Sequence, residues 1–443
     1  MPLFNSSQTS ITPILMVIDA CKNMKPLPVA VFCGTGKPDV GAFLCDLVRE
    51  LRDFSDGIVI DGHAFQLKSV VFLCDAPARA HLQCINYHTH RNGCGYCDTY
   101  GSSIEGRVVF PTVRGNQRTD DQYSQMLENN QSYRSPLLQI PLVGLYSSFP
   151  PDYLHLVNLG IMRRLCHFYF SKVKGFSLNC RLSGSQMDAV SLAILHCRKH
   201  LPSEFQRKLR PLKELAHYKG TEFRTFLLYL GPFLLRKHLP ERYLHNFLLL
   251  HFSIYVFCSA RFSHFFENAK CAIEKFVAQT PNLFSEKCVV YNFHVALHIP
   301  EFYEMYGPLD NWSTFFAENY LSYVKRRVKA TSNINSHVVN TMSAIRFIYT
   351  NPFDQSLKFS NKSPDNCADS EFGIIYITDV DCENLVSGYR LKFVKDIYDY
   401  PYPSSSLNIG IYKKTDSFLS QVAPNNKCVC IDYKDNFLII PFA

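Results

Sequence analysis

The pattern of apolar residues changes three times along this sequence of 443 residues, and each change limits the folds open to it. The first segment mixes strands and helices. Strand-like runs cover 12–18 and 28–34, and helical spacing follows at 39–54. A continuous apolar run at 69–75 is typical of a fully buried strand. The N-terminal part is therefore predicted to contain two strands, a helix and then a central strand that ends at Asp75.

The second segment is helical. After a polar, loop-like stretch at 98–150, amphipathic helical patterns dominate from 153 to 290. The clearest of them are 203–218, 222–235 and 266–279. Two further helices are predicted around 291–306 and 313–330.

The third segment is rich in short β-runs separated by turn residues. It covers 372–443 and follows a linker at 351–371. We predict a small β-barrel or β-sandwich there.

Composition narrows the class of protein. Hydrophobic residues make up 47% and charged residues 19%, which is typical of a folded chain. The N-terminus has no secretory signal pattern, and 17 cysteines without one favour a reducing compartment in which thiols stay free or bind metal. The net charge of +8 is compatible with a polyanionic partner and equally with an ordinary basic protein.

Cys94 and Cys97 form a C-x-x-C pair flanked by Gly93 and Gly95. A redox pair usually opens a helix, whereas these glycines favour a turn. Two buried thiols without a ligand are a further possibility. Half of a zinc site is the best single interpretation.

The other two ligands have two candidate sources. His294 and His298 are four residues apart on a predicted helix and so share one face. Val295 follows the first histidine, where a zincin protease would have glutamate, so that class of enzyme is disfavoured. The second choice is a compact local site made from Cys84, His88, Cys94 and Cys97, with His90 nearby.

Two carboxylates are candidates for catalytic metal binding. Asp75 ends the predicted central strand, although an aspartate there can also cap the next helix. Glu318 lies beside the apolar stripe of its helix and needs a partner such as a cation. The same helix ends in a basic run that suits phosphate contacts or a solvated face. That run contains Lys325, Arg326, Arg327 and Lys329.

Asp152 and His155 form a further motif, "DYLHL", at the start of a predicted helix. It is either a helix cap with a packed histidine or a functional pair.

The order of these motifs resembles a known family. "CDAPARA", "GCGYC", "DYLHL", "HVALH" and "FAENYLSYVK" follow one another as in the DDE/D transposases of the CACTA (En/Spm) type, which include animal transposase-domain proteins. The likeness spans nearly the whole chain. More distantly, the pattern is similar to Transib transposases and the catalytic subunit of the V(D)J recombinase.

The resemblance implies an α/β fold with an RNase H-like catalytic core, a long all-α insertion and a small C-terminal β-rich domain. It implies the core at 1–155 and 291–350 and the insertion at 156–290. Structural Zn²⁺ would be bound by Cys94, Cys97, His294 and His298, and would hold the two ends of the insertion together.

The resemblance also implies a chemistry. Asp75 and Glu318 would be the second and third carboxylates that hold two Mg²⁺ or Mn²⁺ ions for DNA strand cleavage and strand transfer. The expected partner is DNA, bound in the nucleus, and a homodimer is left open.

The first carboxylate of the family has no match. It belongs to an Asp-Gly just upstream of a segment like "MPLFNSSQTS", where this sequence begins. Asp19 does not fit the motif, and Asp61 has the following glycine but the wrong topological place. We therefore expect a truncated or inactive copy, or a domesticated, zinc-stabilised protein that binds DNA or another partner without catalysis. A zinc hydrolase is disfavoured because four protein ligands leave no open position.

Overall fold

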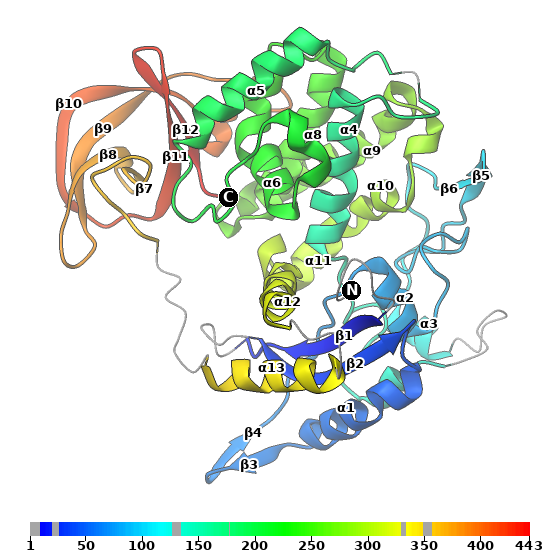
Figure 1. Cartoon of the computed structure of the whole chain (residues 1–443). Coiled ribbons are helices and arrows are strands. Elements are labelled where there is room, and N and C mark those ends of the chain that lie inside the picture. Colours follow the sequence, from blue (N-terminus) through cyan, green and yellow to red (C-terminus); the bar gives the residue numbers. More distant parts are fainter. Residues whose placement is uncertain (1–8, 20–25, 126–133, 177, 329–333, 349–356) are drawn as a thin grey trace. The chain divides into compact units, whose positions relative to one another are not determined.

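The computed structural model describes residues 9–19, 26–125, 134–176, 178–328, 334–348 and 357–443. Helices and strands are mixed, so the fold class is α/β in the broad sense (Figure 1). The chain divides into two compact units, each made of three segments. The first unit contains 1–100, 115–152 and 312–355, and the second contains 101–114, 153–311 and 356–443.

The first unit has a two-stranded antiparallel sheet. Strands β1 (Thr9–Met16) and β2 (Leu27–Thr35) pair in a register that sets Pro13 opposite Val31. Helices α12 (Phe315–Arg327) and α13 (Ile334–Ile348) pack on it. Their shared core contains Ile11, Tyr320, Val324, Val328, Val338 and Met342. Segments that are about 300 residues apart in the sequence thus build one core.

Helix α1 (Val40–Ser55) matches the predicted helical spacing. It begins after Asp39, whose carboxylate accepts a hydrogen bond from the Ala42 N–H at 2.8 Å. An aspartate at this position satisfies one of the unpaired N–H groups of the first turn. The remaining regular elements of this unit are short: the β3–β4 hairpin (Ile58–Ile60 and His63–Phe65), α2 (Ala76–Gln83) and α3 (Asp120–Gln125).

The prediction of a central strand at 69–75 is wrong. This segment has no regular secondary structure and joins no sheet. The Phe72 N–H donates to the Ser148 carbonyl at 2.8 Å, and the Phe72 ring stacks on Phe149 at 4.9 Å. Its apolar residues are half-buried by such side-chain packing. An apolar run predicts burial, but a strand also needs a neighbouring strand.

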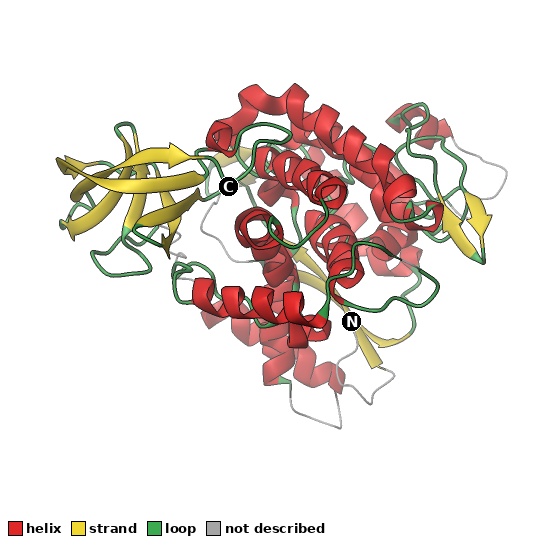
Figure 2. Cartoon of the chain, turned by 90° about the horizontal axis from the view of Figure 1, so that it is seen from above, coloured by secondary structure: helices red, strands yellow, loops and turns green. Residues whose placement is uncertain are grey.

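The second unit has a helical part and a barrel (Figure 2). A π-helix at Leu154–Met162 continues into α4 (Arg163–Phe170). The β5–β6 hairpin (Ser102–Ile104 and Arg107–Val109) also belongs here. The other helices are α5 (Gly184–Arg198), α6 (Gly220–Thr225), α7 (Gly231–Leu235), α8 (Glu241–Phe257), α9 (Phe266–Leu283), α10 (Tyr291–Val295) and α11 (Ile299–Tyr306).

The amphipathic pattern at 203–218 does not form the predicted α-helix. Only a 3₁₀ segment, Leu212–His217, is present. Pro211 explains the difference, since a proline inside an α-helix removes a hydrogen bond and restricts the residue before it.

The C-terminal strands form a closed six-stranded barrel in the order β10-β12-β11-β7-β8-β9. The strands are β7 (Cys367–Ser370), β8 (Gly373–Val380), β9 (Val386–Lys395), β10 (Gly410–Val422), β11 (Asn426–Tyr433) and β12 (Asn436–Pro441). The barrel therefore begins earlier than the predicted boundary at 372.

The barrel packs against α8. Buried His251 binds the Leu227 carbonyl through Nδ1 at 2.8 Å and the Tyr398 hydroxyl through Nε2 at 2.9 Å. Burial lowers the pKa of His251 to about 4, so the ring is neutral at physiological pH. The Tyr255 hydroxyl donates to the Pro441 carbonyl at 2.6 Å. The barrel and the helices thus share a buried interface.

A buried lysine fixes the same interface. Lys427 on β11 is 0% exposed, and its Nζ lies 2.8 Å from Glu204 and 2.7 Å from Asp365. Burial would raise the pKa of Asp365, but hydrogen bonds from Lys427 and from the Ser203 N–H outweigh it and hold the pKa below its ordinary value.

We expect Lys427→Met to lower the free energy of unfolding by roughly 3 kcal/mol, since it leaves two carboxylates without their buried cation. Urea denaturation would measure the loss, with Lys395→Met at an exposed strand position as the control. The deficit should shrink as the pH falls through the lowered pKa of Asp365, because protonation removes the charge that Lys427 neutralises. An equal urea midpoint for the two variants would contradict this role.

Candidate metal centre

The C-x-x-C segment is a buried turn held by the chain around residues 117–123. Cys97 forms a β-bridge with Gln117. The Arg118 Nε donates to the Cys97 carbonyl at 3.0 Å, and the Tyr123 hydroxyl donates to the Gly95 carbonyl at 2.6 Å. Cys94 and Cys97 are 2% and 0% exposed. The turn is therefore fixed by backbone contacts that do not involve the two thiols.

Both glycines of the turn are required by close contacts. A Cβ on Gly95 would lie 2.8 Å from the guanidinium of Arg79, which is buried over the Tyr96 ring. A Cβ on Gly93 would lie 2.6 Å from the Tyr87 carbonyl oxygen. A side chain at Gly93 would displace the turn, and one at Gly95 would displace the Arg79 guanidinium.

The two histidines lie on the predicted helical segment and are 0% exposed. His294 Nδ1 is 3.1 Å from the Pro111 carbonyl, and its ring stacks on Phe110. His298 Nδ1 is 3.3 Å from a carboxylate oxygen of Glu301. A metal-binding histidine typically uses its second nitrogen in such a bond, which fixes the ring and its tautomer. In both residues Nε2 is then the nitrogen available to a metal.

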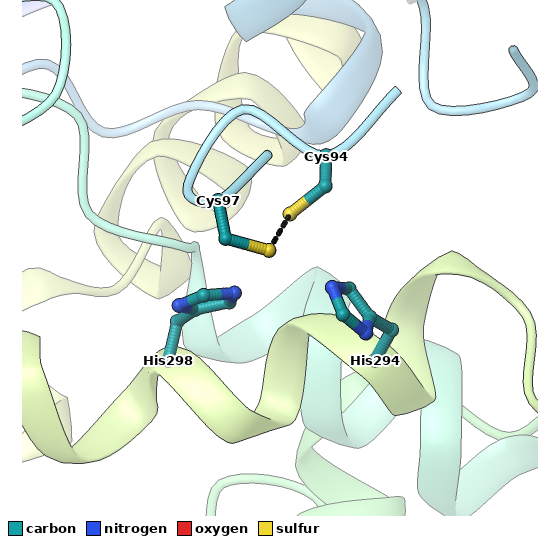
Figure 3. A group of neighbouring side chains, drawn as sticks. All are labelled: Cys94, Cys97, His294 and His298. Carbon is teal, nitrogen blue, oxygen red and sulfur yellow. Dashed lines mark hydrogen bonds between the residues drawn. The ribbon is translucent and has the colours of Figure 1, made fainter. Parts of the chain in front are cut away.

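The structure brings the four predicted ligands together. One ligand atom from each of Cys94, Cys97, His294 and His298 lies within 4.8 Å of the other three, and all four residues are buried. Figure 3 shows both imidazoles directed toward the sulfur atoms. The two Sγ atoms are 3.6 Å apart. Zinc bonds of about 2.0–2.3 Å in a tetrahedron set ligand atoms at roughly this spacing. These side chains could hold a metal ion such as zinc.

The electrostatics of the pair also suit a cation. Burial raises the pKa of the Cys94 thiol well above its usual range, and the neighbouring Cys97 raises it further. Two buried thiols in contact cannot both ionise without a positive charge, and a bound metal supplies that charge.

The alternative local site is not formed. Among the described residues, the cysteines and histidines named above are the only group of three or more metal-binding side chains, and Cys84 and His88 do not belong to it. Cys84 instead ends α2 in a left-handed conformation, with its thiol directed at the His81 carbonyl.

The two candidate catalytic carboxylates lie in the first unit. Asp75 caps α2, where its Oδ1 accepts the Ala78 N–H at 2.8 Å, so the capping role foreseen as the alternative is present. Glu318 is half-buried in the first turn of α12, and its N–H donates to the Thr314 carbonyl at 3.0 Å.

Asp152 fixes the start of the helix that carries Glu318. It is 4% exposed, and its two oxygens accept the backbone N–H and the hydroxyl of Thr314 at 2.8 and 2.7 Å. Thr314 is the N-cap residue of α12. Asp152 therefore holds the N-cap residue of α12 in place. His155 is half-buried in the π-helix, and its carbonyl lies 2.8 Å from where a Gly160 Cβ would be.

The basic run lies at the C-terminal end of α12. Arg326 donates from Nε to the Ser322 carbonyl at 3.2 Å, and the Arg327 guanidinium lies over the Tyr323 ring. Lys325 occupies the same last turn, and Lys329 lies outside the described residues. Positive charge also stabilises this end of a helix through the helix dipole.

Sequence reasoning missed the groups that orient the ligands. Glu301 could have been found, because it lies three residues after His298 on the same helical face. Pro111 and Arg79 act through tertiary contacts that leave no spacing signal.

In comparison with known proteins, the sequence matches no family model and no curated protein. None of the described helices combines the length and the apolar character needed to cross a membrane. The resemblance to transposases thus depends on the order of the sequence motifs alone.

We expect about one metal ion per purified chain, with zinc favoured by two thiolate and two imidazole ligands. Cys97→Ser should lose the ion, and Cys84→Ser should keep it, as measured by mass spectrometry of the eluted metal. Loss of the ion from Cys84→Ser would favour the alternative local site, and retention by Cys97→Ser would contradict both sites, since Cys97 belongs to each.

We expect Asp152→Ala to destabilise the first turn of α12 by about 1–3 kcal/mol, because the Thr314 N–H loses its acceptor in a buried place. Hydrogen exchange at the amides of residues 315–320 should accelerate accordingly. Asp152→Asn keeps one acceptor oxygen and should have the smaller effect. Equal protection in all three proteins would rule out the positioning role.

Proposed function

We propose that this chain derives from a DDE/D transposase of the CACTA type and is related to enzymes that cleave and transfer DNA strands by a two-metal mechanism. The main support is the buried group of four ligands. The family resemblance implied that "HVALH" would join "GCGYC" although many residues separate them in the sequence. A chance similarity of motif order gives no reason for that meeting.

The proposed role of zinc is structural. Two thiolates and two imidazoles fill a tetrahedral site, so no position is left for a reacting water. The Nδ1 bonds to Pro111 and Glu301 hold both rings in place. In this proposal the ion ties residues 94–97 to residues 294–298 and supports an RNase H-like core interrupted by the helical segment.

The proposed catalytic groups are Asp75 and Glu318. When bound, Mg²⁺ or Mn²⁺ would activate the attacking oxygen and stabilise the leaving oxygen of a phosphodiester. Asp75 would contribute Oδ2, since Oδ1 is engaged by the Ala78 N–H. Asp152 would act as a positioning residue by fixing Thr314 and so the first turn that carries Glu318. DNA would be the partner, with the basic end of α12 as one contact.

The first carboxylate of the family is not supplied by either candidate in this sequence. Asp61 and Gly62 form the tight turn of the β3–β4 hairpin, where both have positive φ. An Asp-Gly pair is a favoured sequence for such a turn. Asp19 is an exposed turn residue. The proposed state of this chain is therefore inactive, since neither aspartate takes the place of the first carboxylate.

A second candidate is a domesticated DNA-binding or interaction protein that keeps the fold and the zinc but performs no catalysis. It is favoured by the engagement of Asp75 as a helix cap, which accounts for this aspartate without any metal.

We expect the purified chain to bind Mn²⁺ in electron paramagnetic resonance titrations without nicking supercoiled plasmid DNA. Asp75→Asn and Glu318→Gln should each weaken Mn²⁺ binding at least roughly tenfold, since each removes a charged oxygen ligand. Glu304→Gln, at an exposed position of α11, is the control. Unchanged Mn²⁺ binding in both site variants would contradict the catalytic ancestry of these carboxylates and favour the second candidate.

A further inference from the structure

A second pair of histidines lies where the end of α5 meets the β11–β12 hairpin (Figure 1). His196 is in the last turn of α5, and His200 follows the helix by two residues. Their ring centroids are 5.3 Å apart, compared with 5.7 Å for His294 and His298 of the buried group. The spacing that identified one candidate metal-binding pair therefore occurs a second time in this chain.

Both histidines contact the same residue of the hairpin, Asp432. His196 Nε2 is 3.3 Å from the Asp432 backbone carbonyl oxygen, and His200 Nε2 is 3.8 Å from a carboxylate oxygen of Asp432. The strand register sets Asp432 opposite Phe437, next to the turn of the hairpin. Donor atoms around a tetrahedral ion with bonds of about 2.0–2.1 Å are roughly 3.3 Å apart. The three residues thus place nitrogen and oxygen atoms at nearly the spacing of a coordination shell.

The Nε2 atom of His200 is buried and forms no hydrogen bond with any described residue. A buried polar atom without a partner is costly, and native structures rarely contain one. Burial lowers the pKa of the His200 imidazole, and the neighbouring Asp432 carboxylate acts in the opposite direction. The ring is therefore neutral at physiological pH, which is the form that binds a metal.

The Asp432 carboxylate lacks a permanent cation. Within the described part of the chain its only ion pair is with His200, and this pair is charged only when the imidazole is protonated. Lys199 and Lys434 are close in sequence to this contact, but neither forms an ion pair with Asp432 among the described residues. A neutral imidazole and a carboxylate thus face each other, and a divalent cation between them would satisfy both.

We propose that His196, His200 and Asp432 bind a divalent transition-metal ion where α5 meets the β11–β12 hairpin. Two imidazoles and one carboxylate suit Ni²⁺, Cu²⁺ or Zn²⁺ and leave positions for water. The three side chains are not all gathered within 4.8 Å, as the four buried ligands are. His196 and Asp432 are exposed, so their side chains have room to turn toward the buried His200 nitrogen.

The ion in this site links the helical part to the barrel and exchanges with solvent. The site uses none of the buried cysteine and histidine ligands and neither candidate catalytic carboxylate. It therefore does not depend on the transposase ancestry.

Equilibrium dialysis of the full chain against Ni²⁺, followed by mass spectrometry of the retained metals, tests the proposal. The chain is purified with the ion of its buried site in place, so that zinc and nickel are counted separately. We expect about one nickel per chain beside an unchanged zinc content. His196→Asn and Asp432→Asn should each weaken nickel binding at least about tenfold, since each removes one of three protein ligands. His264→Asn, at an exposed position of the helical part, is the matched control.

The outcomes distinguish a metal site from a simple surface contact. Nickel that is bound by the unaltered chain and by the control, and lost from both site variants at equal melting temperatures, supports the proposal. Absence of nickel binding by the unaltered chain overturns it and leaves His200 and Asp432 as a pH-dependent ion pair. Nickel binding that persists in both site variants also overturns it and assigns the ion to other side chains.

Discussion

The strongest local constraint in this structure is the buried group formed by two cysteines and two histidines. Their ligand atoms lie within 4.8 Å of one another, and all four residues are buried. Polar groups gathered in such a place are costly unless they are paired, and a metal ion pairs all four at once. The ligands are also far apart in sequence. An ion held there restricts the unfolded chain strongly, because it closes a long loop.

The fold could be predicted wherever the residue spacing within a single helix or strand was enough to identify it. Helical spacing identified α1 and α9, and turn-separated β-runs identified the barrel. The strand predicted at 69–75 is absent. An apolar run is expected both for a chain segment buried against Phe149 and for a strand paired in a sheet, so the sequence does not distinguish the two. The helix at 203–218 does not form because Pro211 interrupts it, although the apolar residues around it have helical spacing. The closure of the barrel depends on pairings between strands, which no single segment encodes.

The candidate site was predictable to the extent that chemistry restricts residue types. Few side chains bind zinc, so C-x-x-C and a histidine pair at helical spacing were visible in the sequence. The residues that position them were not. A side chain at position 95 would meet the Arg79 guanidinium, which occupies the space of a Gly95 Cβ. Asp152 is needed because its carboxylate accepts the hydrogen bond from the Thr314 N–H. Both facts depend on segments that meet only in the folded chain.

The contact between α8 and the barrel has a mechanical consequence. His251 binds Tyr398, and Tyr255 binds Pro441, so the central buried helix is joined to the barrel at two places along its length. The barrel and α8 are therefore expected to move together, because a displacement of one against the other would break both buried hydrogen bonds.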